Sequence, residues 1–273
     1  MIRILRVTLA ALLGVLLWAQ TAATPERQAY EKYRLWITKQ PVAVQRSEEQ
    51  WQLYRAELKR QGLSEGDADA RIKLILQQGR VLEIERWNEI LTASQPRFNT
   101  DPNAFLVAMV KGRKPGKALD VGMGQGRNAV WLAQQGWDVT GFDPAERAVA
   151  LARQNAEKAG VKLKTEIVGS EEFSFGENQW DLIVLSYVGA RDVKENVERS
   201  LKPGGIVVVE GAHRDATKTQ SIGGAVVFDT GELPMLFSQL RSVFYAEPME
   251  VPDFGPKRKW RLVRYCGEKP NAE

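Results

Sequence analysis

A glycine-rich turn between two apolar runs is the feature that most restricts the fold of this chain. Residues 118–126 read Ala-Leu-Asp-Val-Gly-Met-Gly-Gln-Gly, a helical pattern at 128–135 closes at Gly136, and a second apolar run at 139–142 ends at Asp143. Glycines allow a tight turn and let the backbone lie close to a ligand. A carboxylate at the tip of the second strand, roughly 20 residues further on, can accept both hydroxyl groups of a ribose. We therefore expect this half of the chain to hold an adenosine-bearing cofactor.

The spacing of the glycines distinguishes between cofactors. Dinucleotide-binding turns have the pattern G-x-G-x-x-G, with backbone N–H groups facing a pyrophosphate. Here the glycines at 122, 124 and 126 form G-x-G-x-G, and Arg127 follows. Asp120 lies two residues before the first glycine, where its charge would repel a pyrophosphate but attract the ammonium of a methionyl group. Both features favour S-adenosyl-L-methionine (SAM) over NAD.

With these motifs the chain resembles the class I SAM-dependent methyltransferases. The segments Gly126-Arg127-Asn128-Ala129, Leu132-Ala133 and Gly136-Trp137-Asp138-Val139-Thr140 are similar to the tellurite-resistance-type, small-molecule branch, and the resemblance spans about residues 98–266. It implies an α/β fold with a seven-stranded, doubly wound, Rossmann-like sheet. The candidate cofactor-binding residues are Asp120, Gly122, Met123, Gly124, Gln125, Gly126, Asp143, Pro144, Ser170, Glu171 and Ser186.

Two simpler interpretations of these residues stay open. The glycine turn can be only a tight link between a strand and a helix. Asp143 can be only the N-cap of the next helix, because Pro144 suits the first helical position and Glu146 lies where a capping box places its acid. Ribose binding and capping are compatible, so Asp143 can serve in both.

The alternation of apolar runs and helical patterns predicts the rest of the fold. Strands are expected at 118–121, 138–142, 163–168, 181–185 and 206–210, helices at 145–159 and near 232–240, and an antiparallel hairpin from 243–251 and 260–266. Ligands of such sheets bind beyond the carboxyl ends of the strands, at the switch in strand order.

That rule selects residues after the third and fourth strands. Relatives often carry an Asp after the third strand that contacts the adenine, but this chain has Gly169-Ser170 in that place. Ser170 can offer its N–H and hydroxyl groups instead, and Glu171 either receives the amine of the adenine or is a solvated loop acid. Ser186 and Tyr187 follow the fourth strand and are expected beside the methionyl moiety and the methyl group.

The expected chemistry is in-line displacement at the methyl group of SAM, for which alignment of the reactants is the main task. A general base is needed only if the acceptor is protonated, and a histidine can accept a proton near neutral pH. The only histidine, His213, follows the fifth strand and is a catalytic candidate, as is Tyr187, which is placed to shape the acceptor pocket. The alternative for His213 is a polar surface residue. Arg214 is a candidate to pair with an anionic acceptor.

The N-terminus has the form of a secretory signal. Arg3 and Arg6 precede an uncharged, mostly apolar run at 7–19, and Thr21-Ala22-Ala23 supplies small residues for cleavage after Ala23. We expect export to the periplasm or the exterior, with a retained membrane anchor or a misassigned start of a cytosolic enzyme as alternatives. Export conflicts with the cytosolic supply of SAM, and the sequence does not reconcile the two.

Residues 24–95 read as a helical extension of a catalytic domain at 96–273. Ser47-Glu48-Glu49-Gln50 has the form of a capping box, and a long helical pattern runs from about 67 to 92 with Gly79 as a candidate kink. In the resembling enzymes the segment before the first strand often folds over the cofactor, which makes Phe98 and Asn99 of the link at 93–103 candidates for contact. The aromatic residues expected to pack between the extension and the catalytic domain, or alternatively to bind substrate, are Trp36, Trp51, Tyr54 and Trp87.

Charge and cysteine content exclude some classes of protein. The 38 Lys and Arg residues stand against 34 Asp and Glu, and without Arg3 and Arg6 the count is 36 against 34, which is too balanced to indicate a nucleic-acid partner. The sequence after the fourth strand also lacks Asn/Asp-Pro-Pro-Tyr, which argues against methylation of adenine bases. Cys266 is the only cysteine, so an intramolecular disulfide is excluded and a buried thiol is expected.

The sequence therefore predicts a SAM-dependent methyltransferase that acts on a small-molecule acceptor. Contact with a membrane is expected only if residues 1–23 are retained, and no oligomeric state is predicted. The first alternative is an exported, non-catalytic binding or scaffold protein of the same fold. The second is an NAD-dependent oxidoreductase, which the glycine spacing disfavours.

Overall fold

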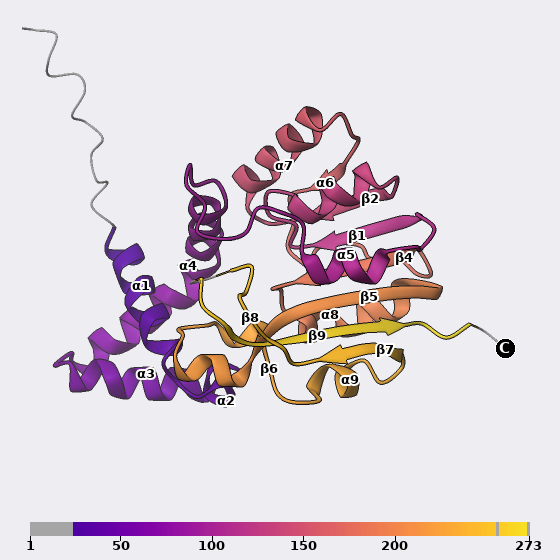
Figure 1. Cartoon of the computed structure of the whole chain (residues 1–273). Coiled ribbons are helices and arrows are strands. Elements are labelled where there is room, and N and C mark those ends of the chain that lie inside the picture. Colours follow the sequence, from indigo (N-terminus) through magenta and orange to yellow (C-terminus); the bar gives the residue numbers. More distant parts are fainter. Residues whose placement is uncertain (1–23, 255–256, 272–273) are drawn as a thin grey trace, which may run out of the picture.

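A mixed sheet forms the centre of the computed structural model, which describes residues 24–254 and 257–271 (Figure 1). The predicted secretory segment at 1–23 lies outside these residues. The main strands are ordered β3-β2-β1-β4-β5-β9-β7, which confirms the predicted doubly wound sheet. Their bounds are β1 Lys117–Val121, β2 Asp138–Phe142, β3 Lys164–Glu166, β4 Trp180–Ser186, β5 Leu201–His213, β7 Arg241–Ala246 and β9 Trp260–Glu268, and the short strands β6 Val227–Phe228 and β8 Met249–Glu250 pair with β5 and β9.

The strands β1 to β5 pair in parallel, and β9 lies antiparallel between β5 and β7. The predicted C-terminal hairpin is thus confirmed. Parallel neighbours require long crossover connections, and helices follow β1, β2 and β4. The helices of this domain are α5 Ala104–Val110, α6 Arg127–Gln134, α7 Glu146–Lys158, α8 Ala190–Ser200 and α9 Glu232–Leu236, with 3-10 turns η1 Arg214–Lys218 and η2 Gly224–Val226.

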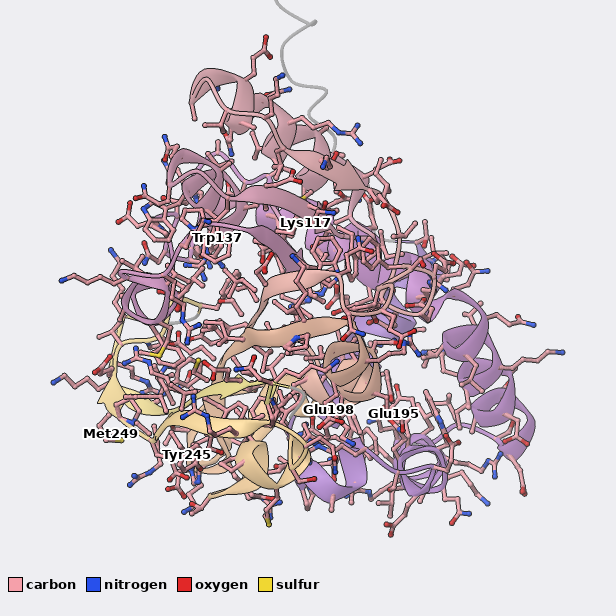
Figure 2. All side chains as sticks on the ribbon, turned by 90° about the vertical axis from the view of Figure 1, so that its right-hand side faces the viewer. Lys117, Trp137, Glu195, Glu198, Tyr245 and Met249 are labelled. Carbon is pink, nitrogen blue, oxygen red and sulfur yellow. The ribbon has the colours of Figure 1, made fainter. Side chains whose placement is uncertain are left out.

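Hydrophobic side chains cover both faces of the sheet. Alternate residues of a strand point to opposite faces, so Leu119 and Ile183 join one core with α8 and α9, while Ala118 and Leu182 join another with α5 and α6. Figure 2 shows Trp137 on one side of the sheet and Glu195 and Glu198 of α8 on the other. Burial on both faces explains why these strands read as continuous apolar runs.

The N-terminal extension has an aromatic core of its own. Its helices are α1 Pro25–Ile37, α2 Val42–Gln45, α3 Glu49–Arg60 and α4 Glu65–Leu91. The ring centroids of Trp36 and Tyr54 are 4.8 Å apart, and Trp51 stacks on a tyrosine of α1. The expected contact with the catalytic domain is therefore wrong for these three residues, which pack within the extension. Trp87 does cross the boundary, where it packs with Phe254.

Some local expectations are wrong for identifiable reasons. Ser47 does not cap α3, because its hydroxyl donates to the carbonyl of Val44 and the N-cap of the helix is Glu48. The helix α4 continues through Gly79, which lies beside the ring of Tyr30 on α1. The strand β3 is shorter than expected, and β5 is longer at both ends, because Leu201 pairs with Trp180 of β4 and residues 211–213 pair with β9 and β6.

Two further features follow from burial and length. Cys266 is buried in β9, as expected, and desolvation raises the pKa of its thiol to about 11. Among the described residues, none of the helices has both the length and the apolar character that a bilayer crossing requires.

The aromatic core of the extension can be tested by truncation of Tyr54, which is only 2% exposed. We expect Tyr54→Ala to lower the free energy of unfolding by about 3–5 kcal/mol, since a large ring is removed from a packed core. Urea unfolding followed by fluorescence measures the loss, with Tyr54→Phe as the control that keeps the ring. An unchanged midpoint for Tyr54→Ala would show that the extension does not contribute to the cooperative unit.

Candidate functional site

The glycine turn lies at the carboxyl end of β1 and adopts a backbone that only glycine accepts easily. The φ angles of Gly122, Gly124 and Gly126 are 62°, 55° and 79°, in the left-handed region. A Cβ atom on Gly122 would lie 2.5 Å from Cγ1 of Val188, and one on Gly124 would lie 3.2 Å from a methyl group of Leu91. The end of β4 and the helix α4 therefore close directly onto the turn.

Asp120 is a buried acid without a complete set of partners. Its side chain is 2% exposed, and its Oδ2 atom has no hydrogen-bond partner among the described residues. Desolvation raises the pKa of Asp120 to about 7, although the positive charge of Arg127 acts in the opposite direction. Since buried polar atoms are rarely left unsatisfied, this oxygen is suited to receive a cationic group of a ligand.

Asp143 ties the glycine turn to the next helix. Its Oδ2 accepts the N–H of Gly124 at 3.0 Å, and its Oδ1 accepts the N–H of Ala145 at 2.8 Å. Burial raises the pKa of Asp143, while these two N–H groups lower it. The predicted capping box is absent, because α7 begins at Glu146 with Ala145 as its N-cap. Each carboxylate oxygen keeps a further lone pair for a ribose hydroxyl.

A cavity of about 470 Å³ opens at the carboxyl ends of β1, β2 and β4. Four predicted cofactor-binding residues line it, namely Gly122, Pro144, Ser170 and Glu171. The other lining residues are Val121, Phe142, Gly169, Val188, Gly189, Asp192 and Val193 of the catalytic domain and Arg80, Glu83, Ile84 and Trp87 of α4. An N-terminal helical segment that borders the pocket was expected, and Trp87 was an alternative candidate to bind substrate, but Arg80, Glu83 and Ile84 were not identified from the sequence.

The remaining predicted cofactor residues lie beneath or beside the turn. Met123 and Gln125 are buried, and Met123 packs with α7 residues rather than facing the cavity. The Nε2 atom of Gln125 is buried without a partner among the described residues. Ser186 ends β4, where its hydroxyl accepts a hydrogen bond from Arg127 at 3.2 Å.

A strap made of two distant segments covers this side of the sheet. Phe98 and Phe254 form an isolated antiparallel bridge with stacked rings 4.8 Å apart, and the N–H of Asn99 donates to the carbonyl of Asp253. The ring of Phe254 also lies 5.6 Å from that of Tyr187. The link before β1 therefore pairs with the segment around Phe254, and Phe98 and Asn99 are part of this strap and do not line the cavity.

Tyr187 belongs to a buried polar network. Its hydroxyl donates to Oε1 of Glu210 at 3.0 Å, and the same oxygen receives Nδ2 of Asn103 at 2.7 Å. Arg264 pairs with the other oxygen at 2.5 Å. Burial and the nearby carboxylates raise the pKa of Tyr187 far above its ordinary value, so the phenol stays protonated. The φ angle of 59° at Tyr187 is strained for a side chain with a Cβ.

The structure does not bring His213 to this network. Its Nε2 lies 3.0 Å from the hydroxyl of Thr230, its Nδ1 accepts the N–H of Asp215, and Glu247 lies 3.8 Å away. The ring is 8% exposed, so His213 is not a surface residue, and it does not line the cavity. Arg214 pairs with Asp229. The catalytic role of His213 stays a prediction.

Several residues of the Tyr187 network and of the strap were not identified from the sequence, namely Asn103, Glu210, Asp253 and Phe254. One signal was present, because Glu210 is a charged residue within an apolar strand pattern and is 3% exposed. Arg127 belongs to the segment Gly126-Arg127-Asn128-Ala129, but the sequence did not indicate what its side chain binds. It pairs with Asp253 at 2.9 Å and so joins the glycine turn to the strap.

Comparison with known proteins gives a match between residues 118–205 and the family described as "Methyltransferase domain". The probable S-adenosyl-L-methionine-dependent methyltransferase TehB of Haemophilus influenzae is 36% identical over 34% of this chain and 32% of its own length. The ribosomal RNA small subunit methyltransferase C of Alcanivorax borkumensis is 27% identical over 49% of this chain and 48% of its own. The chain thus spans half or less of the length of these curated relatives.

Solved structures share the fold at low sequence identity. The crystal structure of N-methyltransferase NodS from Bradyrhizobium japonicum, in complex with S-adenosyl-L-homocysteine, superposes with a TM-score of 0.52 and 19% identity over 69% of this chain and 98% of that chain. The crystal structure of TehB from Haemophilus influenzae superposes with a TM-score of 0.50 and 21% identity over 61% and 62% of the two chains.

Asp120 makes stability depend on pH. Its pKa rises from 3.8 to about 7 on folding, so the folded state binds more protons than the unfolded state between these values. The contribution of Asp120 to stability is therefore greatest below about pH 4 and falls by about 1.4 kcal/mol per pH unit until about pH 7. We expect Asp120→Asn, which cannot ionise, to lack this slope. Urea midpoints from pH 5 to 8 measure it, and parallel curves for the two proteins would contradict the assignment.

Proposed function

We propose that the protein is a SAM-dependent methyltransferase acting on a small molecule, on the basis of the match between residues 118–205 and the methyltransferase domain family. The observation that carries the proposal is the buried oxygen of Asp120, which has no partner among the described residues and immediately precedes Val121 and Gly122 in the lining of the cavity. An ammonium group of the methionyl moiety is the partner that this oxygen lacks.

The charge of the cavity supports SAM over a dinucleotide. Three acids line it, namely Glu83, Glu171 and Asp192, and Arg80 is the only basic residue in the lining. SAM carries a positive sulfonium, whereas the pyrophosphate of NAD would face these acids with like charge. Ser170, Phe142 and Pro144 offer surface for the adenosine, and Asp143, which lies in the chain between the lining residues Phe142 and Pro144, is assigned to the ribose.

When bound, SAM supplies a methyl group on a positively charged sulfur that leaves with the electron pair of its carbon–sulfur bond. The residues of this chain then have to orient the acceptor and exclude water. Tyr187 stays protonated, and its hydroxyl donates a hydrogen bond to Glu210. Its role is therefore to shape the acceptor pocket and not to act as a base. The aromatic strap around Phe254 keeps solvent from the same region.

A small-molecule acceptor agrees with two properties of the chain. The balance of 36 basic and 34 acidic residues beyond position 23 provides no excess positive charge for a nucleic acid. The motifs at 126–140 resemble the tellurite-resistance-type, small-molecule branch, and TehB is among the relatives of this chain. Residues 1–23 support a further proposal, that the protein is exported.

The second candidate is a binding or scaffold protein of the same fold without turnover. The observation that favours it is the loop after β3, where Gly169-Ser170 replaces the acid expected to contact the adenine. Incubation with SAM labelled in its methyl group and a panel of thiols, phenols, amines and oxyanions discriminates between the two. We expect transfer to at least one acceptor class, while binding of SAM without transfer to any of them would favour the scaffold.

The cofactor assignment can be tested by calorimetry with SAM and with S-adenosyl-L-homocysteine. We expect Asp143→Ala to weaken binding about tenfold to a hundredfold, because a charged hydrogen-bond acceptor for the ribose is lost. The matched control is Asp138→Ala at the exposed start of β2, where the carboxylate pairs only with Lys164. Unchanged affinity for Asp143→Ala would show that the ribose assignment is wrong, and binding of NAD instead of SAM would support an oxidoreductase.

A further inference from the structure

One face of α4 is turned toward the cofactor half of the catalytic domain. Arg80, Glu83, Ile84 and Trp87 line the cavity, and Leu91 touches the glycine turn at Gly124. These residues follow one another at intervals of three, one, three and four positions, which places all of them on the same side of a helix. The contact is therefore a continuous surface of α4.

The C-terminal half of α4 is firmly attached to the catalytic domain. Asn88 is 2% exposed, and its Oδ1 accepts the N–H of Arg147 on α7 at 2.8 Å. Glu85 pairs with the side chain of the same arginine at 2.7 Å. Leu91 packs with Ala145 and Ala148 at the start of α7. These contacts fix the position of this face of α4 relative to the glycine turn.

The attachment at Arg80 is of a different kind. Its guanidinium pairs with Glu171 at 2.7 Å and Glu172 at 3.1 Å, both in the loop after β3. Arg80 and Glu171 side chains are each 56% exposed, and exposed pairs contribute little to stability. These ion pairs therefore connect α4 to the loop after β3 at one side of the cavity, but they hold the two segments together only weakly.

Between these two attachments, Ile84 and Trp87 present apolar surface to the cavity. The neighbouring charges are engaged elsewhere, since Glu83 accepts from the hydroxyl of Tyr30 at 2.7 Å and also pairs with Arg86. Arg86 lies over the ring of Trp87, 5.0 Å from its centroid, and restricts its position. Flat apolar surface beside Ser170 is what an adenine ring requires.

We propose that α4 is a part of the cofactor site: Ile84 and Trp87 bind the adenosine half of SAM, and the pairs of Arg80 with Glu171 and Glu172 slow its departure. This inference rests on the proposed function. It also accounts for the loop after β3, since apolar contact from α4 takes the place of the missing acid. The extension is then required for cofactor affinity, beyond any structural role.

Binding of S-adenosyl-L-homocysteine to the full chain tests the proposed contact of Ile84 and Trp87 with the adenosine. We expect Trp87→Ala and Ile84→Ala to weaken it about tenfold, from the loss of buried apolar contact. The matched control is Leu76→Ala, on the same helix but 60% exposed and outside the cavity, which should bind like the wild type. Trp87→Phe keeps an aromatic surface and should recover most of the affinity, which separates lost contact from misfolding.

Dissociation rates test the ion pairs. We expect Arg80→Glu to release the ligand about two- to fivefold faster, as suits an exposed pair, and the triple reversal with Glu171→Arg and Glu172→Arg to restore the slower rate. If the wild type binds and the Trp87 and Ile84 variants bind equally well, the inference about α4 is overturned while the proposed function stands. If the wild type binds neither SAM nor its demethylated product, the proposed function itself fails.

Discussion

The bonds of Asp143 to the N–H groups of Gly124 and Ala145 are the interaction on which the site depends. They fix a turn of left-handed glycines against the start of α7, so β1, β2 and two helices meet at a single carboxylate. Asp120 is thereby enclosed below the turn, where removal from water opposes its ionisation. The fold thus holds a charge that is costly in the absence of a ligand and favourable in the presence of a cation.

The sequence predicts well those features that arise from neighbouring residues. The bounds of β2 are those expected, β1 begins one residue earlier and β4 is one residue longer at each end, because apolar runs between glycine and proline signals specify buried parallel strands. The turn is also local, since its glycines and Asp120 lie within seven positions. The predicted capping box at Ser47 is wrong because a serine hydroxyl can donate to a nearby carbonyl, here that of Val44, instead of accepting a backbone N–H of the helix.

Features formed by contacts between distant segments could not be predicted in this way. The strap joins Phe98 to Phe254, the network joins Asn103 to Glu210, and α4 meets the loop after β3 through Arg80. None of these pairs has a periodic pattern that marks its partner. Only the presence of Glu210 within an apolar strand indicated that a buried partner had to exist.

The features formed by neighbouring residues lie in the segment that this chain shares with other proteins, whereas the features formed by distant residues lie mostly outside it. The segment that matches the methyltransferase domain, 118–205, contains the turn, Asp120 and Asp143. The strap, its partner Asn103 and the face of α4 lie outside that segment. Under the proposed function, acceptor choice is therefore expected to depend on residues 98–103 and 252–254, where Phe254 packs against Tyr187, and not on the segment that matches the family.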